Sequence, residues 1–251
     1  MLKLNVKITF PDGKRSYCGE IFTTTPDSNN KIEGSFRYVR SYLDSPRAFS
    51  LDPENLPLGP QEFFTQRPEG VHGVFEDALP DDWGRALLAQ KEKIPRSDQT
   101  IPKLLEALGS NGLGALCFET EKKTPHGESS ASIYDLETLV ETALKYDAGL
   151  PVDNESLLKL FSCGSSPGGA RPKVLIQKKS GSLWLAKFPK ASDSFHIEPI
   201  EAGTLEMAQN AGLPTPEFEI RKADDKRILL VKRFDVADQG GRYHMISMKA
   251  L

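Results

Sequence analysis

The chain has 251 residues, of which 38% are hydrophobic and 27% are charged, and its formal net charge is −3. This composition is typical of a globular protein with a substantial buried core, and the length favours two domains. No apolar run approaches the roughly 20 residues that cross a bilayer, and the N-terminus does not resemble a secretory signal. The charge gives no reason to expect direct nucleic-acid binding. Three widely spaced cysteines without a Cys-x-x-Cys pair favour a reducing compartment, so we expect a cytoplasmic protein without a membrane partner.

Residues 1–119 are expected to form a β-rich domain with helices. Apolar residues at every second position from Leu2 to Phe10 predict a half-buried strand, and a return strand after the turn at Pro11–Lys14 would complete a hairpin. The patterns that follow predict a third strand, a long proline- and glycine-rich loop, two helices and a buried strand, over residues 35–42, 44–70, 81–90, 101–108 and 114–118. Residues 120–132 are polar and aperiodic, which predicts a linker or a long loop.

Residues 133–251 are expected to form the second domain, so the fold class should be α+β. Two helices, at residues 134–146 and 154–161, lead into a loop that is rich in small residues. After this loop the patterns predict two strands, at residues 174–176 and 183–188, and then a helix at residues 198–212. Two further strands are expected at residues 217–220 and 228–231, with a charged turn at residues 222–227 between them. The last strand ends at Lys232-Arg233-Phe234-Asp235.

The loop Ser165-Ser166-Pro167-Gly168-Gly169-Ala170-Arg171-Pro172-Lys173 carries the clearest chemical signal. Two glycines let the backbone approach a ligand closely, and successive free N–H groups suit a phosphate. Lys187 would project from the second strand toward the same phosphates, and Glu201, in the first turn of the following helix, would pair with it. A surface turn between a helix and a strand, with Lys173 and Lys187 in solvent, is the alternative. The order of these elements is that of a protein-kinase-like nucleotide lobe.

At this point the sequence resembles the HipA family of serine/threonine kinases, the toxin halves of bacterial toxin–antitoxin pairs. The resemblance covers nearly the whole chain, and its most specific part is the glycine loop followed by Arg233-Phe234-Asp235. The other matching segments are Leu79–Arg85, Leu113–Leu116, Leu185–Pro189 and Arg242–Met248.

The resemblance implies an ATP- and magnesium-dependent kinase that can phosphorylate a serine in its own glycine loop, here Ser166. Known family substrates include an aminoacyl-tRNA synthetase, and a helix-turn-helix antitoxin usually binds the kinase. The ATP-binding residues would be Gly168, Gly169, Ala170, Lys173, Lys187, Phe234 and Asp235, with Glu201 as the partner of Lys187. Phe234 and Asp235 would flank the adenine and the ribose, although Phe234 is equally suited to core packing. Pro167 departs from the better-known family loops, which carry a small or aliphatic residue there.

A second departure concerns catalysis. A kinase needs an aspartate to orient the substrate hydroxyl, and an asparagine and an aspartate to hold magnesium, and the family supplies these after the hinge. None of the four histidines of this sequence begins a His-x-Asp motif, and there is no Asp-Phe-Gly. We therefore expect a kinase-like N-lobe without the C-terminal catalytic lobe. No residue of this chain is assigned a catalytic or metal-binding role, ATP should bind weakly or partially, and magnesium should bind only if the missing lobe is supplied.

Two functions remain open on these grounds. The first is the N-terminal part of a HipA-like kinase toxin that is inactive alone and needs the kinase C-lobe, either from a separate chain or from a longer parent gene. The alternative is a non-catalytic interaction or regulatory module that binds a kinase subunit or an antitoxin, and a gene remnant without activity is a third possibility. If the catalytic lobe is missing, we expect residues 245–251 to lack a surface to pack against and to promote self-association.

Overall fold

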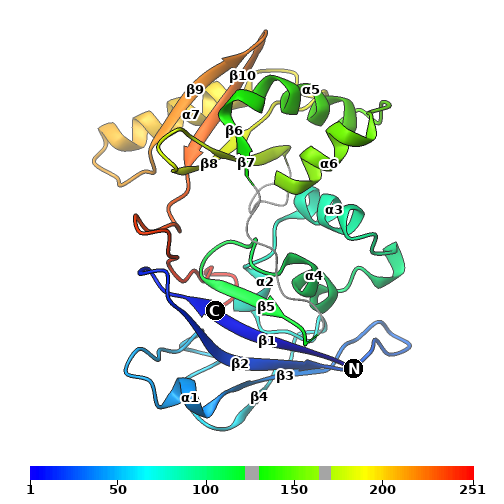
Figure 1. Ribbon diagram of the computed structural model, residues 1–251, viewed down its shortest axis with the longest axis vertical. Coiled ribbons are helices and arrows are strands. Elements are labelled where there is room, and N and C mark those ends of the chain that lie inside the picture. The colour runs from blue at the N-terminus through cyan, green and yellow to red at the C-terminus, as the bar shows by residue number, and fades with distance from the viewer. Residues whose placement is uncertain (122–129, 164–170) are drawn as a thin grey trace. The chain divides into compact units, whose positions relative to one another are not determined.

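The structure is a computed structural model that describes residues 1–121, 130–163 and 171–251 (Figure 1). It contains two compact units, each assembled from separate stretches of chain. The N-terminal unit comprises Met1–Pro80, Glu92–Glu128 and Asp235–Leu251, and the C-terminal unit comprises Asp81–Lys91 and Ser129–Phe234. The ranges 1–119 and 133–251 that the sequence suggests for the two domains remain a prediction, and the compact units differ from them in where they place residues 81–91 and 235–251.

The N-terminal unit is built on a five-stranded antiparallel sheet in the order β4-β3-β2-β1-β5. The strands are β1 (Leu2–Thr9), β2 (Arg15–Thr23), β3 (Gly34–Tyr38), β4 (Glu62–Phe64) and β5 (Leu116–Glu119). Its helices are α1 (Arg40–Leu43), α2 (Gly73–Glu76), the 3₁₀ turn Arg96–Asp98 and α4 (Ile101–Leu108). The alternation in β1 buries Leu4, Val6 and Ile8 on one face, as the period of two requires. The core continues through aromatic contacts, with the rings of Phe36 and Phe75 5.1 Å apart.

One predicted element of this unit is wrong in its second half. The strand expected over residues 35–42 ends at Tyr38, and Arg40–Leu43 form the single helical turn α1. The reason lies in Tyr42, which is fully buried and whose hydroxyl donates a 3.1 Å hydrogen bond to the carbonyl of Phe49. Burial of this ring therefore overrides the alternating pattern that continues past Tyr38.

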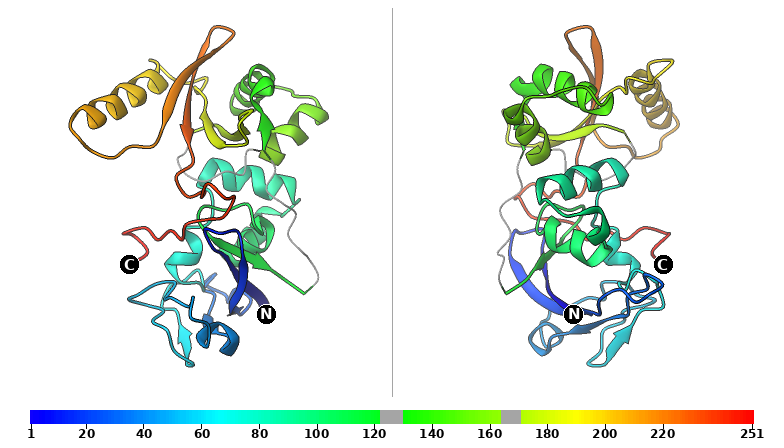
Figure 2. Two further views of the ribbon diagram at one scale, coloured as in Figure 1. Left: turned by 60° about the vertical axis from the view of Figure 1, so that its left-hand side comes forward. Right: turned by 90° about the vertical axis from the view of Figure 1, so that its right-hand side faces the viewer.

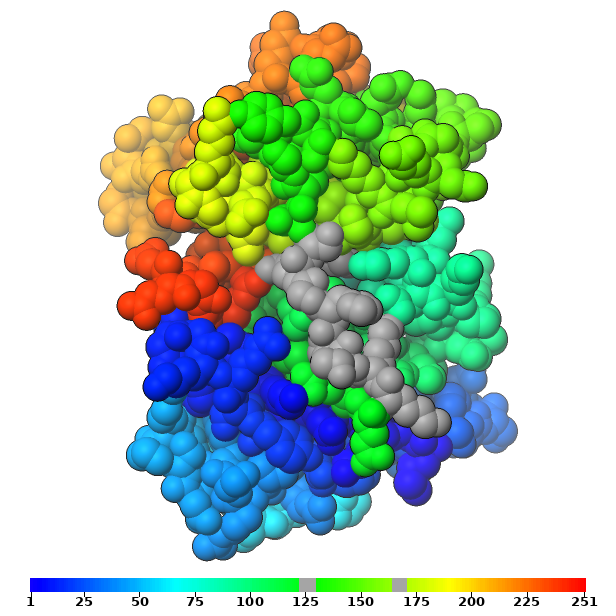
Figure 3. All heavy atoms as spheres, in the orientation of Figure 1, coloured from blue at the N-terminus to red at the C-terminus, as the bar shows by residue number. Residues whose placement is uncertain are grey.

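The C-terminal unit is built on a second five-stranded sheet in the order β6-β7-β8-β10-β9. Only the pairing of β6 with β7 is parallel. The strands are β6 (Ala131–Ser132), β7 (Lys173–Gln177), β8 (Leu183–Lys187), β9 (Phe218–Ala223) and β10 (Lys226–Lys232). The helices are α3 (Asp82–Lys91), the 3₁₀ turn Ile133–Asp135, α5 (Leu136–Asp147), α6 (Asn154–Cys163) and α7 (Ile197–Asn210). Figure 3 shows the β7–β8 turn against the start of the α5 segment, where Lys179 Nζ lies 5.3 Å from the Tyr134 ring.

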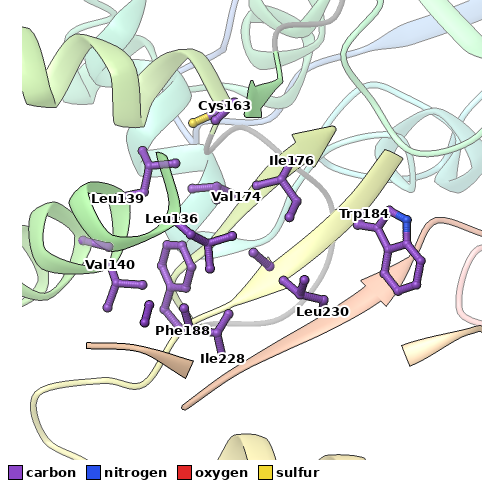
Figure 4. Close-up of a cluster of buried hydrophobic side chains, with 14 of the residues drawn as sticks. Leu136, Leu139, Val140, Cys163, Val174, Ile176, Trp184, Phe188, Ile228 and Leu230 are labelled. Atoms are coloured by element: carbon purple, nitrogen blue, oxygen red, sulfur yellow. The ribbon is translucent and has the colours of Figure 1, made fainter. Parts of the chain in front are cut away.

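The two faces of this sheet have different roles. One face packs on α5 and α6 and forms the core shown in Figure 4, with Val174, Ile176, Trp184, Ile228 and Leu230 contributed by the strands. Because side chains alternate along a strand, the opposite face carries Lys173, Leu175, Leu185, Lys187, Leu229 and Val231. The helix α7 lies along the β9–β10 hairpin on the side away from α5 and α6 (Figure 2). Trp83 of α3 packs against the core of this unit.

The charged turn expected over residues 222–227 is shorter in the structure. β9 continues to Ala223 and β10 begins at Lys226, so that Asp224 and Asp225 alone form the turn. Asp224 has a φ of 52°, a left-handed conformation that aspartate tolerates in tight hairpin turns. The long charged stretch is therefore strand backbone with exposed side chains, and the mixed α+β class expected for the chain is confirmed.

The segment from Met245 to Leu251 is anchored within the N-terminal unit. The backbone N–H and the hydroxyl of Ser247 donate hydrogen bonds of 2.6 and 2.8 Å to the carboxylate of Asp77. Ala250 is buried against Gly73. A Cβ added to Gly73 would lie only 2.7 Å from the Ala250 Cα. The expectation that this segment has no surface to pack against is wrong for these residues, although Met248 remains 88% exposed.

Candidate nucleotide-binding site

Lys187 and Glu201 form the centre of the candidate site. Lys187 is the last residue of β8, and Glu201 lies in the second turn of α7. The ammonium Nζ of Lys187 donates a hydrogen bond to Glu201 Oε1, and the two side chains are 26% and 35% exposed. The pair is therefore held in one geometry while it remains accessible from solvent.

Lys173 lies directly opposite Lys187 at the same end of the sheet. The two lysines are cross-strand partners in the antiparallel β7–β8 pair, so their side chains leave the same face. The side chain of Lys173 is almost fully buried, and its Nζ donates a 3.1 Å hydrogen bond to Asp81 Oδ2. Burial lowers the pKa of Lys173, as does the charge of Lys187, whereas the Asp81 carboxylate opposes this shift.

The two lysines differ in how accessible their ammonium groups are to a ligand. A phosphate oxygen needs an ammonium group that it can reach, and Lys187 offers one at the edge of solvent. Lys173 is hydrogen-bonded to Asp81 and shielded from solvent, and its suggested contact with phosphate stays a prediction. Among the described residues, Lys187 is therefore the better candidate for direct phosphate contact.

Arg171 provides a third cation at this end of the sheet, two residues before β7. Its guanidinium donates a 2.9 Å hydrogen bond from Nη1 to Asp193 Oδ1, and Nη2 contacts both Asp193 Oδ2 and Glu198 Oε1. The hydrogen bond from Arg171 is the main reason that the pKa of the Asp193 carboxyl is lowered. Because Glu198 lies in the first turn of α7, Arg171 ties the entry to β7 to the helix that carries Glu201.

The sheet face beside these charges is apolar. Leu175 and Leu229 are buried, while Leu185 and Val231 are partly buried. Of these side chains only Leu185 and Val231 are partly open to solvent beside Lys187, whereas Leu175 and Leu229 are closed off. An aliphatic surface next to a reachable lysine suits a ligand with a flat apolar part and an anionic part, and ATP has both. Binding of ATP at this face stays a prediction of the sequence. ATP supplies the transferable phosphoryl group when bound, and the part of this chain would be to hold its phosphates through Lys187.

Phe234 and Asp235, which the resemblance places beside the adenine and the ribose, have different surroundings. Phe234 is 60% exposed, so it is not a core residue. Asp235 is fully buried in the N-terminal unit, where its Oδ2 accepts a 2.9 Å hydrogen bond from the backbone N–H of Gly114. The guanidinium Nη1 of Arg242 lies 3.8 Å from the same oxygen. These contacts give Asp235 a structural role, and its suggested contact with ribose stays a prediction.

Most of the glycine loop lies outside the described residues. Ser166, Gly168, Gly169 and Ala170 lie outside the described residues, as does most of the expected linker, so their roles remain sequence predictions. Within the described ranges, no group of three or more histidine, cysteine or acidic residues is arranged to hold a metal ion. Among the same residues, none of the helices has the length and apolar character to cross a membrane.

Sequence reasoning missed two partners of the site. Asp81 pairs with Lys173 across 92 positions of the sequence. Asp193 was not singled out, although it lies six residues after Lys187 and pairs with Arg171. The first contact has no local signal, whereas an acidic residue in the short connection between a strand and a helix could have been considered for the second.

The three cysteines are structural. Cys18, Cys117 and Cys163 are all buried and not bonded to one another. Burial raises the pKa of the Cys117 thiol to about 11 and that of Cys163 to about 12. Thiols with such pKa values are poor nucleophiles at neutral pH.

Comparisons with known proteins agree with this architecture. The HipA N-terminal domain model matches residues 18–119, and the HipA-like C-terminal domain model matches residues 165–251. No curated protein matches the chain. A similar solved structure is HipA of the Shewanella oneidensis MR-1 toxin–antitoxin system, in complex with HipB and operator DNA, with a TM-score of 0.56 and 17% identity. The match covers 91% of this chain and 50% of the Shewanella chain, so this chain spans half the length of that relative.

The fold and the paired lysine define an α+β protein with a candidate nucleotide-binding sheet. The two family models leave out only residues 1–17 and 120–164, and both describe HipA. The chain belongs to the HipA-like family of toxin–antitoxin proteins.

Proposed function

We propose that this chain is the N-terminal part of a HipA-like serine/threonine protein kinase, in which a kinase-like N-lobe holds ATP. Lys187, oriented by Glu201, contacts the phosphates, and the glycine loop at Gly168 and Gly169 covers them. The observation that carries this proposal is the accessible ion pair between the end of β8 and α7. A lysine fixed by a helix glutamate is the arrangement on which phosphate positioning in protein kinases depends.

Nucleotide binding tests this proposal directly. We expect ATP to bind to the chain with a dissociation constant in the high micromolar range or weaker, which corresponds to no more than about 6 kcal/mol. The chain supplies only one side of the adenine pocket and no assigned magnesium ligands. Lys187→Ala should weaken this binding by about tenfold or more, measured by calorimetry at millimolar ATP.

A matched control exists on the same sheet. Lys232 ends β10, pairs with Glu217 and projects from the opposite face, so Lys232→Ala removes a comparable strand lysine from a different position. ATP binding should be unchanged in this variant. Equal ATP affinity in the Lys187→Ala protein and the unmutated protein would overturn the assignment of Lys187.

We further propose that a protein consisting of these 251 residues does not transfer phosphate on its own. The sequence contains no His-x-Asp or Asp-Phe-Gly motif to orient a hydroxyl and hold magnesium. With ATP and magnesium, mass spectrometry should detect no phosphate on Ser166 or on a generic protein substrate. Incorporation of phosphate by the pure chain would show that catalytic groups exist which the sequence reading missed. Addition of a chain that carries the kinase C-lobe should restore transfer.

The alternative function, an interaction module, is supported by the surface of α7. This helix has 14 residues, of which only Glu198 and Ala202 are buried, while Ile200 and Met207 are 55% and 65% exposed on the same face. An exposed apolar stripe of this kind favours a protein partner. A kinase subunit or an antitoxin is the partner expected for the family, and cytoplasmic location follows from the same expectation. Co-purification with an antitoxin that is lost in Ile200→Ser/Met207→Ser, while ATP binding is absent, would favour this function.

A further inference from the structure

A cavity lies in the C-terminal unit, apart from the Lys187–Glu201 pair. It has a volume of about 620 Å³ and lies between the end of α5, the connection from β8 to α7, and the start of β10. Neither Lys187 nor Glu201 lines it. Cavities of 300 to 1,000 Å³ are typical of small-molecule sites, so this volume is sufficient for an organic ligand.

The wall of this cavity is largely apolar. It includes aliphatic groups from the end of α5 and from the loop that follows β8, and its mouth carries two exposed apolar side chains. Leu150 is 58% exposed and Phe195 is 59% exposed. The other apolar lining residues are Leu144, Ala148, Pro189 and Ala191. A hydrocarbon or aromatic body would remove both exposed side chains from water, which is favourable in proportion to the area covered.

The charges at the rim are predominantly positive. Four cations line the cavity against two carboxylates, and both carboxylates are already paired. Glu141 binds Lys145 at 2.6 Å, and Asp193 binds Arg171. Lys226 is paired with Asp225 at 2.9 Å, which leaves Lys190 and Arg227. Among the described residues, neither of these two has a carboxylate within ion-pair distance.

The backbone holds Lys190 at the cavity. Its N–H donates a 2.8 Å hydrogen bond to Asp193 Oδ2, and the N–H of Asp193 donates a 3.2 Å hydrogen bond to the Lys190 carbonyl. Asp193 is fixed in turn by Arg171. The turn from Lys190 to Asp193 is therefore held by reciprocal contacts, and Phe195 follows it by two residues.

We propose that this cavity binds a small organic anion, with an aromatic or aliphatic body against Leu150 and Phe195 and its acidic group between Lys190 and Arg227. The chemical class is a carboxylate, sulfonate or phosphate attached to an apolar body. An uncharged molecule of the same shape would leave the two cations unmatched, and an inorganic anion would not use the apolar wall.

A pair of fluorescent probes tests this proposal. The anionic probe is 8-anilinonaphthalene-1-sulfonate, and the uncharged probe of similar shape is N-phenyl-1-naphthylamine. The double variant Lys190→Gln/Arg227→Gln should weaken binding of the sulfonate by about fivefold and change binding of the neutral probe by less than about twofold. Phe195→Ala should weaken both probes, because it removes apolar surface that they share.

The control removes two charges elsewhere on the same unit. Lys159 and Lys179 are exposed and lie outside the cavity, so Lys159→Gln/Lys179→Gln should bind both probes as the unmutated chain does. Circular dichroism checks that each variant is folded, since the sulfonate also binds loosened proteins. Equal loss of sulfonate binding in the two double variants would overturn the proposal, as would no loss in either.

The nucleotide proposal is tested separately by the same probes. Saturating ATP should not displace the sulfonate, and Lys187→Ala should bind it normally. Displacement by ATP would place the probe at the candidate nucleotide site and overturn the second site. Normal sulfonate binding in a chain that fails to bind ATP would support this inference and contradict the proposed function.

Discussion

The two units differ in the groups that hydrogen-bond to their charged side chains. In the N-terminal unit the carboxylates of Asp52 and Asp235 are fully buried and accept hydrogen bonds from backbone N–H groups, those of Glu54, Asn55 and Gly114. In the C-terminal unit the charged groups at the end of the sheet pair mainly with other side chains. Lys173 is buried there, whereas Arg171, Lys187 and Glu201 remain partly exposed. A carboxylate that satisfies backbone groups cannot leave without breaking the fold, whereas a side-chain pair can admit a ligand anion. The comparison assigns structure to the first set and binding to the second.

The largest effect should come from Asp235. Asp235→Ala leaves the Gly114 N–H without its acceptor and removes a buried charge near Arg242, so we expect a loss of about 3 kcal/mol in the free energy of unfolding. Urea denaturation measures this loss. Asp238→Ala, which alters an exposed aspartate three residues away, should change stability by less than about 0.5 kcal/mol. If the two variants unfold alike, Asp235 is not the structural group that its contacts indicate.

The second effect is a dependence on pH. Burial lowers the pKa of His72 to about 4 and also lowers that of His244, while the charge of Asp52 opposes both shifts. The unfolded chain takes up a proton near pH 6.5 that folded His72 does not accept until about pH 4, so stability falls as the pH drops through this window. Lowering the pH from 7 to 5 should cost about 2 kcal/mol through His72 alone.

The variant His72→Gln should flatten this pH profile, measured as the urea midpoint at pH 7 and pH 5. His196 is exposed and precedes α7 without a side-chain hydrogen bond to the helix, so His196→Gln should retain the full dependence. A profile that is equally steep in both variants would mean that other groups carry the titration.

The smallest effect on stability is expected at the candidate site. Glu201→Gln breaks a partly exposed ion pair and should lower the free energy of unfolding by less than about 1 kcal/mol. ATP binding should nevertheless weaken, because Lys187 loses the group that orients it. Glu206→Gln, on the same helix and exposed, should alter neither property. A stability loss at Glu201 as large as that at Asp235 would break the distinction between the two units.

Local patterns predicted much of this architecture. The alternation in β1 and the helical spacing of α4 and α7 identified these elements because burial on one face leaves a period in the sequence. Glu201 was found for the same reason, since a helix start close behind the lysine strand limits the candidates. Contacts between distant residues left no such trace. The pairing of Lys173 with Asp81, and that of Asp235 with Gly114, depend on how strands meet after folding, and Asp81 alone is consistent with a solvated helix start.

The discontinuous make-up of the N-terminal unit has a consequence for synthesis on the ribosome. Its sheet is complete once β5 has been made, yet Asp235 and Ser247 must still reach Gly114 and Asp77, more than a hundred residues back. All of the C-terminal unit except α3 is translated in between. Until residues 235–251 are made, the Gly114 N–H of the nascent N-terminal sheet lacks its acceptor and the surface that Ala250 covers is exposed. During this interval the sheet is accessible to chaperones and proteases.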